Sequence, residues 1–329
     1  MNFRKLCLCS IPGIFFLAGC STDPSVMHAR KELRSMNTPF TAGAFNQAVS
    51  EGDVEKVNLF IQGGISMKGI DGTNPLLTAV NANKLEVVKK LIDSGVDVDT
   101  ISDYGTPLCV ASAKGYKKIA EYLISEGADI DFVKGSINPL LLAAAANHKN
   151  IVMLLINEGA DIDTEGESTS YTPLIIAAKK GNTEIVKILL KEGAYTDTRD
   201  YTRKTALDYA IINGDEDTAS ELLKEDYFDA TEDSSIDSFA LSISLNKLDI
   251  TKKMIDTDID INADFGEIPL LSWAIYNSYT DGAKLLIESG ADLNKEDKNQ
   301  RIPLDYALMK QNKTIIDAIR TNPTFTKNK

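Results

Sequence analysis

Histidine and cysteine are scarce in this 329-residue chain, and their scarcity excludes several kinds of site. The two histidines are His28 and His148, and of the four cysteines only Cys109 lies beyond residue 20. Two separate histidines do not form a metal-binding pair, and a single cysteine has no partner for an intramolecular disulfide. Phosphate-binding glycine loops and the G-x-S-x-G nucleophile motif are also missing. We therefore predict no catalytic residues, no metal ligands and no cofactor site, and hence a protein that is not an enzyme.

Basic residues are outnumbered, with 35 Lys and Arg against 48 Asp and Glu, which gives a formal charge of −13. Removal of residues 1–19 would take away Arg4 and Lys5 and no acid, and would lower this charge to about −15. Such a chain repels nucleic-acid phosphates, which need Lys and Arg contacts. It permits a basic protein partner through electrostatic steering.

The first 19 residues have the features of a secretory signal peptide. Arg4 and Lys5 precede an apolar segment, residues 6–17, which is shorter than the roughly 20 residues that span a bilayer. The segment ends Leu17-Ala18-Gly19-Cys20, which resembles the bacterial lipobox and implies cleavage before Cys20 and lipidation of its thiol. An ordinary signal followed by a chance cysteine is the alternative. Ser21 at the next position resembles the outer-membrane default, so we expect a lipid anchor at the periplasmic face of the bacterial cell envelope, in the outer membrane.

Residues 20–40 are polar and contain two prolines, which predicts a flexible, lipid-anchored tether before the first domain. Arg30, Lys31 and Arg34 lie in this segment. They leave open a contact with anionic lipid, although a solvated linker is the simpler interpretation.

A ten-residue string, residues 172–181, recurs through the rest of the chain. Thr172 is a helix N-cap residue, and Pro173 suits the first helical position because its missing N–H costs nothing there. Leu174 and Ala177 point to a buried face, and Gly181 provides the left-handed residue that ends the helix. A second helix with apolar residues at helical spacing follows each such string.

Nine inward-facing anchor residues, 31 to 34 positions apart, mark nine repeats between residues 41 and 320. The anchors are Phe45, Leu76, Leu108, Leu140, Leu174, Leu207, Phe239, Leu271 and Leu304. Alanine follows three positions later in eight repeats, and Ser242 replaces it in the seventh. Residues 321–329 remain as a C-terminal tail.

This pattern resembles the ankyrin repeat, whose signature is T-P-L-H-x-A with a period near 33. The resemblance implies an all-α ankyrin-repeat solenoid of about nine helix–turn–helix repeats with short β-hairpin fingers. Each repeat would bury its apolar face only against its neighbours. Ankyrin proteins generally bind partner proteins through the finger tips and the exposed side of the first helices.

The sixth and seventh repeats depart from the pattern. Asp226 and Asp258 stand where a glycine is expected, and an acidic run follows the first of them. Sequence drift in a tolerant repeat would explain these departures. A weak joint that bends the solenoid, or an insertion that binds a partner, would explain them too.

Three further features have competing interpretations. Paired aspartates recur in the turns, at 97/99, 129/131 and 161/163, and would either hydrogen-bond adjacent turns or form a stripe for a basic partner. Residues 258–264 superficially resemble a calcium loop but lack its glycine and its terminal glutamate, which favours a turn. Cys109 follows Pro107-Leu108 and is expected to be a packing thiol; a reactive nucleophile is the other interpretation.

Aromatic and arginine residues fall on predicted finger tips, where solvent exposure is expected. The partner-binding candidates are Tyr104, Tyr171, Arg199, Tyr201, Arg203 and Phe265. Aromatic and arginine side chains are typical of binding hot spots, but packing between neighbouring fingers would account for them equally well.

These features together favour a non-enzymatic, protein-binding lipoprotein that is monomeric when free. A lipid-anchored periplasmic ankyrin array resembles immunity proteins that bind and neutralise lipase toxins secreted by type VI systems. A periplasmic scaffold or protective partner of an endogenous envelope enzyme is the alternative, and a hydrolase or ion-binding protein is a third possibility from another class. Fold alone does not identify the partner.

Overall fold

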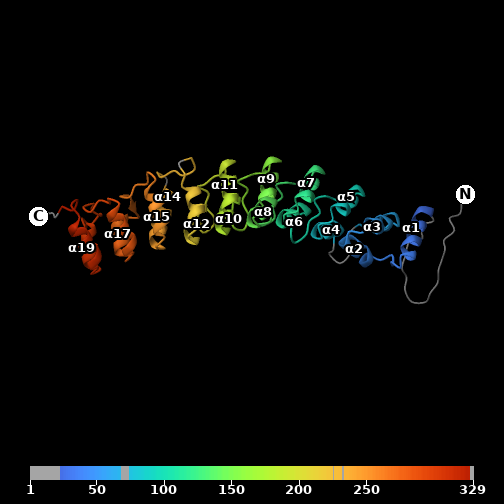
Figure 1. The fold of residues 1–329 in the computed structure, drawn as a ribbon, viewed down its shortest axis with the longest axis horizontal. Helices are drawn as coiled ribbons and strands as arrows, with labels where there is room; N and C mark the ends of the chain where they lie inside the picture. The colour runs from blue at the N-terminus through green and yellow to red at the C-terminus, as the bar shows by residue number, and fades with distance from the viewer. Residues whose placement is uncertain (1–22, 68–73, 225, 232, 327–329) are drawn as a thin grey trace. The chain divides into compact units, whose positions relative to one another are not determined.

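The computed structural model describes residues 23–67, 74–224, 226–231 and 233–326, and all structural statements concern these residues. They form nineteen α-helices and one two-stranded hairpin, as an all-α repeat array requires (Figure 1). The predicted signal peptide and Cys20 lie outside them.

The helices in chain order are α1 (Pro24–Ser35), α2 (Ala42–Glu51), α3 (Val54–Gln62), α4 (Pro75–Asn81), α5 (Leu85–Asp93), α6 (Pro107–Lys114), α7 (Lys117–Ser125), α8 (Pro139–Ala145), α9 (Lys149–Asn157), α10 (Pro173–Lys180), α11 (Thr183–Lys191), α12 (Ala206–Asn213), α13 (Glu216–Leu222), α14 (Asp233–Ser244), α15 (Leu248–Ile255), α16 (Leu270–Tyr276), α17 (Thr280–Glu288), α18 (Pro303–Met309) and α19 (Lys313–Thr321). Strands β1 (Asp264–Phe265) and β2 (Ile268–Pro269) pair antiparallel, with Phe265 opposite Ile268.

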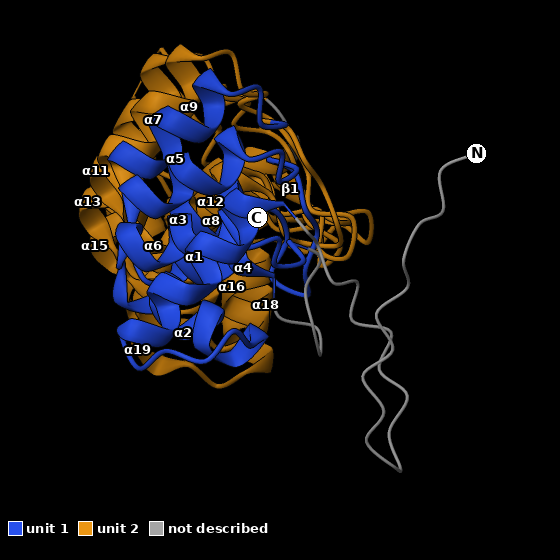
Figure 2. Cartoon of the chain, turned by 90° about the vertical axis from the view of Figure 1, so that its right-hand side faces the viewer, with its two compact units in different colours: residues 1–111, 118–129 blue, residues 112–117, 130–329 orange. Residues whose placement is uncertain are grey.

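The chain divides into two compact units, coloured separately in Figure 2. The first unit comprises residues 1–111 and 118–129, and the second comprises 112–117 and 130–329. In the first unit, α2 packs on α3 and α4, and α5 packs on α3 and α4. In the second unit the even-numbered helices from α8 to α18 form one row, and the odd-numbered helices from α9 to α19 form another.

The recurring string forms its helix as predicted. The Thr172 hydroxyl accepts from the N–H of Ile175 at 3.2 Å, and Pro173 starts α10. Asn138 caps α8 in the same way, because its side-chain oxygen accepts from the N–H of Leu140 at 2.8 Å. Gly181 ends α10 in the left-handed region at φ 71°, and Asn147 fills the equivalent place after α8 at φ 61°. Glycine and asparagine are the residues that adopt this conformation most readily.

The anchor residues form the core, as the spacing predicts. Eight of the nine are buried, and Leu304 in the last repeat is half-buried. The alanines three positions later are also buried, which lets the paired helices approach closely. Ser242 takes the alanine place in α14 and is fully buried, but its hydroxyl donates to the carbonyl of Phe239 at 2.7 Å. The seventh repeat therefore keeps the packing of the array with a satisfied polar group.

The predicted flexible tether is wrong for its described part. Residues 24–35 form α1, which packs against α3 and buries Ala29 and Leu33. Arg30 donates from Nε to the carbonyl of Gly63 at 2.9 Å, and its guanidinium lies 4.5 Å from the ring centroid of Phe40. Ala29 and Leu33, four residues apart, share one helical face among polar neighbours, so the polar composition of the segment does not reveal the helix.

The C-terminal boundary also extends past residue 320. Helix α19 ends at Thr321, and the following residues hydrogen-bond with Asn294, whose side-chain oxygen accepts from the N–H of Thr326 at 3.0 Å.

The fingers vary in form. One is the β1–β2 hairpin, and two have single bridges, between Ser102 and Gly105 and between Lys134 and Ile137.

Candidate functional site

The finger that carries Tyr201 is built around the carboxylate of Asp200. Oδ1 of Asp200 accepts from the N–H of Thr202 at 2.7 Å and of Lys204 at 3.0 Å. Oδ2 accepts from the hydroxyl of Tyr209 on α12 at 2.6 Å. Burial opposes the charge of Asp200, but these hydrogen bonds, led by that of Tyr209, outweigh it and lower the pKa of the carboxyl. The loop from 200 to 204 is therefore held by an ionised, buried carboxylate.

Tyr201 and Arg203 project from this loop into solvent. The ring of Tyr201 is 67% exposed, while its hydroxyl donates to the carbonyl of Glu167 in the neighbouring finger at 2.7 Å. Arg203 is exposed at φ 61°, and among the described residues it forms no ion pair. The two interpretations of the finger-tip residues, partner binding and packing between fingers, therefore both apply in part to Tyr201. Its hydroxyl contacts the preceding finger, while its ring remains accessible to a partner.

Arg199 lies in the same finger but already has a partner. Its Nη1 and Nη2 atoms are each 3.3 Å from Oδ2 of Asp237 on α14, and the arginine side chain is 26% exposed. A partner protein would have to compete with this ion pair. Arg199 is therefore better placed to join neighbouring repeats than to reach outward.

Tyr171 belongs to a cluster on the first-helix row. Its hydroxyl accepts from Nζ of Lys179, and its ring meets that of Tyr209 edge to face at 6.2 Å between centroids. The ammonium of Lys179 lies 4.3 Å from the Tyr171 ring centroid and 4.7 Å from that of Tyr209. The hydrogen bond from Lys179 lowers the pKa of Tyr171, whereas burial, and then the bond to Asp200, raises the pKa of Tyr209. This cluster joins the Asp200 loop to α10.

The last two candidates differ in exposure. Phe265 in β1 is half-buried and packs edge to face on Trp273 of α16, with ring centroids 4.8 Å apart. Tyr104, in the first unit, is 75% exposed, and its N–H donates to the hydroxyl of Ser102 at 3.1 Å. Of the six predicted contact residues, Tyr104, Tyr201 and Arg203 are thus exposed, while Tyr171, Arg199 and Phe265 are half-buried.

The paired aspartates form a hydrogen-bonded ladder between adjacent turns, which was the simpler of the two interpretations. Within the first unit the N–H of Asp129 donates to Oδ1 of Asp99 at 3.0 Å. Within the second, the N–H of Asp161 donates to Asp131 at 2.9 Å, and that of Tyr195 donates to Asp163 at 2.9 Å.

Two of these carboxyls have raised pKa values. Burial is the main cause for both Asp99 and Asp163, and neighbouring carboxylates add to it. Asn262, in the calcium-like segment, makes the same bond to the N–H of Asp292 at 2.7 Å, so that segment is a turn.

Cys109 is fully buried in α6, and its thiol accepts from the hydroxyl of Thr106 at 3.5 Å. Burial raises the pKa of the thiol, which opposes formation of the nucleophilic thiolate. The packing role is therefore the one that its surroundings support.

Sequence reasoning missed the Asp200–Tyr209 pair, although the chain contains it twice. Asp297 repeats the arrangement in the last repeat, where Oδ2 accepts from the hydroxyl of Tyr306 at 2.5 Å and Oδ1 from the N–H of Arg301 at 2.8 Å. In both places an aspartate precedes an Asp-Tyr-Ala string by eight residues. That repeated spacing is the signal that would have identified the loop.

None of the helices formed by the described residues has the length and apolar character needed to cross a membrane. Comparison with known families gives a match to a model described as ankyrin repeats in three copies, at residues 45–134, 140–233 and 239–328. The chain is also 36% identical over 92 residues to a protein of Borreliella burgdorferi that is named an ankyrin repeat protein. This stretch covers 27% of the present chain and 42% of that relative, less than half of its length.

Proposed function

The chain belongs to the ankyrin-repeat family, whose members typically bind other proteins without catalysis, and from this premise we propose what it binds and where. We propose a lipid-anchored immunity protein of the bacterial envelope that binds and neutralises a secreted type VI lipase toxin. The lipobox-like run ending at Cys20 supports the anchor. A membrane anchor would place the inhibitor beside the lipid that such a toxin attacks.

The observation that carries the binding proposal is the rigid loop from 200 to 204. Backbone N–H groups on alternate residues bond inward to Asp200, which leaves the side chains of Tyr201 and Arg203 directed to solvent. A preorganised aromatic and arginine pair loses little conformational entropy on binding and offers contact area with bidentate hydrogen bonding. These two residues are the proposed centre of the interface, with Tyr104 as a separate exposed aromatic in the first unit.

The first experiment tests the surface. A chain of residues 21–329, which keeps all described helices, is used to capture partners from envelope extracts, and each variant is titrated by calorimetry. Tyr201→Ala and Arg203→Ala should each weaken binding by more than about 1 kcal/mol. Lys187→Ala, which removes an exposed pair with Glu184 on α11 and a longer one with Glu221 at 3.9 Å, is the control and should bind like the wild type.

A sharper variant uses the second copy of the loop as its template. Asp297, Lys298, Asn299, Gln300 and Arg301 repeat the hydrogen bonding of residues 200–204. Tyr201→Lys with Arg203→Gln therefore keeps the loop scaffold while replacing both outward side chains. If this double variant keeps full affinity, the assigned surface is wrong.

The second experiment tests the kind of partner. A lipase captured by the chain should lose activity on lipid vesicles at a one-to-one ratio, and a toxin gene should neighbour the gene for this chain. Capture of an endogenous envelope enzyme that remains active would replace immunity with the scaffold role. Hydrolysis of lipid or peptide by the purified chain alone would contradict the non-enzymatic assignment.

A further inference from the structure

Helix α1 carries a basic stripe on the surface of the first unit. The helix buries Ala29 and Leu33 where it packs against α3. Met27, Lys31 and Arg34 follow one another at i, i+4 and i+7, so they share the side of the helix that faces away from these two residues. All three are exposed, and Met27 reaches 62%. We call these three residues the basic stripe of α1.

The two cations of the basic stripe are not neutralised by neighbouring groups. Among the residues that the structure describes, neither Lys31 nor Arg34 forms an ion pair. Glu32 is the one acid within α1, and its Oε1 lies 3.1 Å from Nε2 of His28, off the stripe. The stripe is therefore a locally basic surface on a chain whose formal charge is −13.

Helix α1 is fixed to the first unit by more than its two buried residues. Arg30 donates from Nε to the carbonyl of Gly63 at 2.9 Å, and its guanidinium lies over the ring of Phe40. That ring stacks in turn on Phe60 of α3, with ring centroids 5.6 Å apart. A contact made by the basic stripe would therefore orient the first unit as a whole.

The proposed lipid anchor lies close to this helix along the chain. Pro24, the first residue of α1, follows Cys20 by four positions. Four residues span at most about 14 Å even when they are fully extended. A lipid on Cys20 would therefore leave too little chain for the first unit to stand away from the bilayer, and the start of α1 would lie near the bilayer surface.

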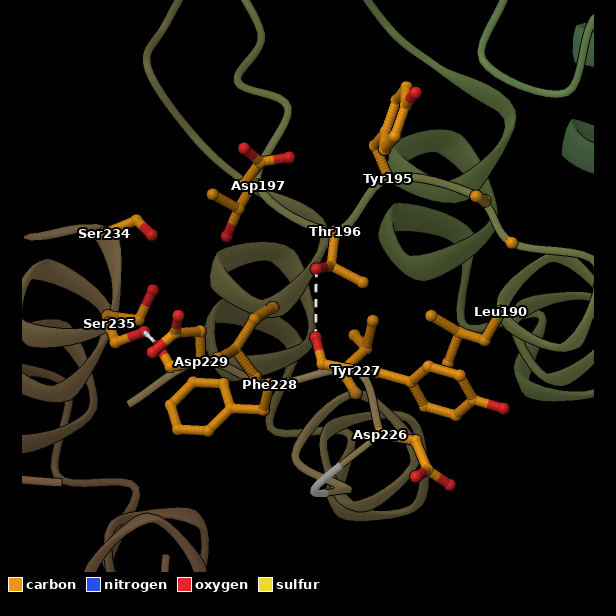
Figure 3. Close-up of a pocket in the computed structure, with 16 residues that line it drawn as sticks. Leu190, Tyr195, Thr196, Asp197, Asp226, Tyr227, Phe228, Asp229, Ser234 and Ser235 are labelled. Carbon is orange, nitrogen blue, oxygen red and sulfur yellow. Dashed lines mark hydrogen bonds between the residues drawn. The ribbon is translucent and has the colours of Figure 1, made fainter. Parts of the chain in front are cut away.

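The hollow in the second unit has the opposite charge and does not form a comparable surface. Figure 3 shows this hollow of about 450 Å³ beside the turn that follows α13. Asp197 and Asp226 lie on opposite sides of the hydrogen bond from the hydroxyl of Thr196 to the carbonyl of Tyr227, so their carboxylates do not converge. No lysine, arginine or histidine lines the hollow, and anionic lipid would repel it. Attraction to an anionic bilayer requires a locally basic face such as that of α1.

We propose that α1 lies along the bilayer with its basic stripe against anionic phospholipid headgroups, and so holds the first unit at the lipid surface. Lys31 and Arg34 would donate charge-assisted hydrogen bonds to lipid phosphate. Met27 would enter the boundary between the headgroups and the acyl chains. The acidic remainder of the chain opposes this contact only weakly, because charges beyond a Debye length of about 8 Å are screened at physiological ionic strength.

This inference rests on the proposed lipid anchor at Cys20. It adds a membrane contact to the proposed function, and this contact uses none of the finger residues. The lipid anchor would keep the chain on the membrane, while the basic stripe would determine how the first unit is oriented there.

The experiment uses residues 20–329 with a single myristoyl chain attached to the thiol of Cys20 through a maleimide. Cys109 is fully buried, so Cys20 is the reactive thiol of the folded chain. One myristoyl chain binds membranes only marginally and reversibly, so a second contact raises the measured affinity. Sedimentation with sucrose-loaded vesicles compares phosphatidylcholine alone with phosphatidylcholine and phosphatidylglycerol in a two-to-one ratio.

We expect the anionic vesicles to bind the chain about tenfold more tightly than the neutral vesicles at physiological salt, since each juxtamembrane cation favours an anionic surface. Equal or weaker binding to the anionic vesicles would overturn the proposal. Met27→Ser should lower the affinity for both kinds of vesicle about threefold, through loss of apolar contact. An unchanged affinity for this variant would refute the placement of α1 along the bilayer.

Charge variants identify the face that binds. Lys31→Gln with Arg34→Gln should abolish the gain on anionic vesicles and leave binding to phosphatidylcholine unchanged. Lys31→Arg with Arg34→Lys keeps both charges and should keep the gain. Lys118→Gln with Lys187→Gln, two exposed lysines on α7 and α11, removes the same charge elsewhere and should bind like the wild type. An equal loss with this control would show that total charge determines binding and would refute a defined face.

One more outcome separates lipid from protein as the partner of the basic stripe. If Lys31→Gln with Arg34→Gln impairs capture of a partner protein and leaves the affinity for anionic vesicles unchanged, the stripe is a protein contact and the proposal is refuted. Because the lipid is attached chemically, the vesicle result does not depend on acylation of Cys20 in cells. It also needs no partner protein, so its failure and failure of the Tyr201 and Arg203 test are distinguishable.

Discussion

Removal of one hydroxyl should test the internal support of the Asp200 loop. Tyr209 is 8% exposed and donates to Oδ2 of Asp200, which is itself 4% exposed. Tyr209→Phe keeps the ring and its edge-to-face contact with Tyr171. It removes the hydroxyl, which donates to Asp200 and also accepts a longer bond from Nζ of Lys179 at 3.4 Å. A hydrogen bond to a charged group contributes about 1.5 to 3 kcal/mol, so the free energy of unfolding should fall by that amount.

The assay is urea unfolding followed by circular dichroism, combined with hydrogen exchange of the 200–204 amides. Exchange is needed because repeat arrays unfold locally through nearest-neighbour interactions. Tyr306→Phe, the equivalent change at Asp297, should cost a similar amount. Tyr195→Phe, on a 66% exposed side chain, is the control and should stay within about 0.5 kcal/mol of the wild type.

The effect should also depend on pH in a defined direction. The pKa of Asp200 is lowered in the folded chain from its ordinary value of 3.8. Its stabilising contribution is therefore fully present above pH 3.8 and is lost as the pH falls through the lower folded value. The difference in the free energy of unfolding between wild type and Tyr209→Phe should therefore become smaller over that acidic range. A difference below 0.5 kcal/mol at pH 7, or one that grows in acid, would refute the reasoning.

Three further outcomes are expected. Cys109 should react with a thiol reagent at pH 7 only after denaturation, because burial raises the pKa of its thiol; rapid labelling of the native chain would contradict this. Ala177→Leu should lower the free energy of unfolding by about 1 to 3 kcal/mol through overpacking, measured against Lys187→Ala as a surface control, and an unchanged urea midpoint would count against close helix packing at this site. Cys20→Ala should abolish acyl labelling of the full chain and leave unprocessed precursor, whereas a mature wild-type N-terminus at another residue would exclude the lipobox.

The repeat core was predictable because every repeat contains the same pattern of apolar and capping residues. Leu174 and Ala177 could be placed from spacing alone, since a period near 33 with helical spacing inside it has one packing solution. Helix α1 was not predicted, because it carries no repeat signature and its two buried residues, Ala29 and Leu33, stand among polar neighbours. A single amphipathic turn gives too little pattern for sequence reasoning to separate a docked helix from a linker.

The sequence did not determine how exposed the predicted contact residues are. Sequence placed Tyr171, Tyr201 and Phe265 at finger tips, but their exposure depends on distant partners such as Lys179 and Trp273, which lie eight residues away from Tyr171 and from Phe265. Such contacts follow from three-dimensional packing, and a one-dimensional pattern does not contain them.

The two aspartate-centred loops of the chain separate structural from exposed positions. Asp200 and Asp297 make equivalent bonds to the backbone two and four residues ahead, and Arg203 and Gln300 both take φ 61°. A left-handed conformation costs a non-glycine residue about 1 to 2 kcal/mol, and since both loops contain it, it belongs to the loop scaffold rather than to a partner. The outward side chains differ completely, Tyr201 and Arg203 in one loop and Lys298 and Gln300 in the other. At the first position both side chains still contact the preceding finger, since Tyr201 donates to the carbonyl of Glu167 and Lys298 pairs with Glu267. Arg203 forms no ion pair among the described residues, and the scaffold accepts glutamine in its place, so contact with another protein is the role that remains for this arginine.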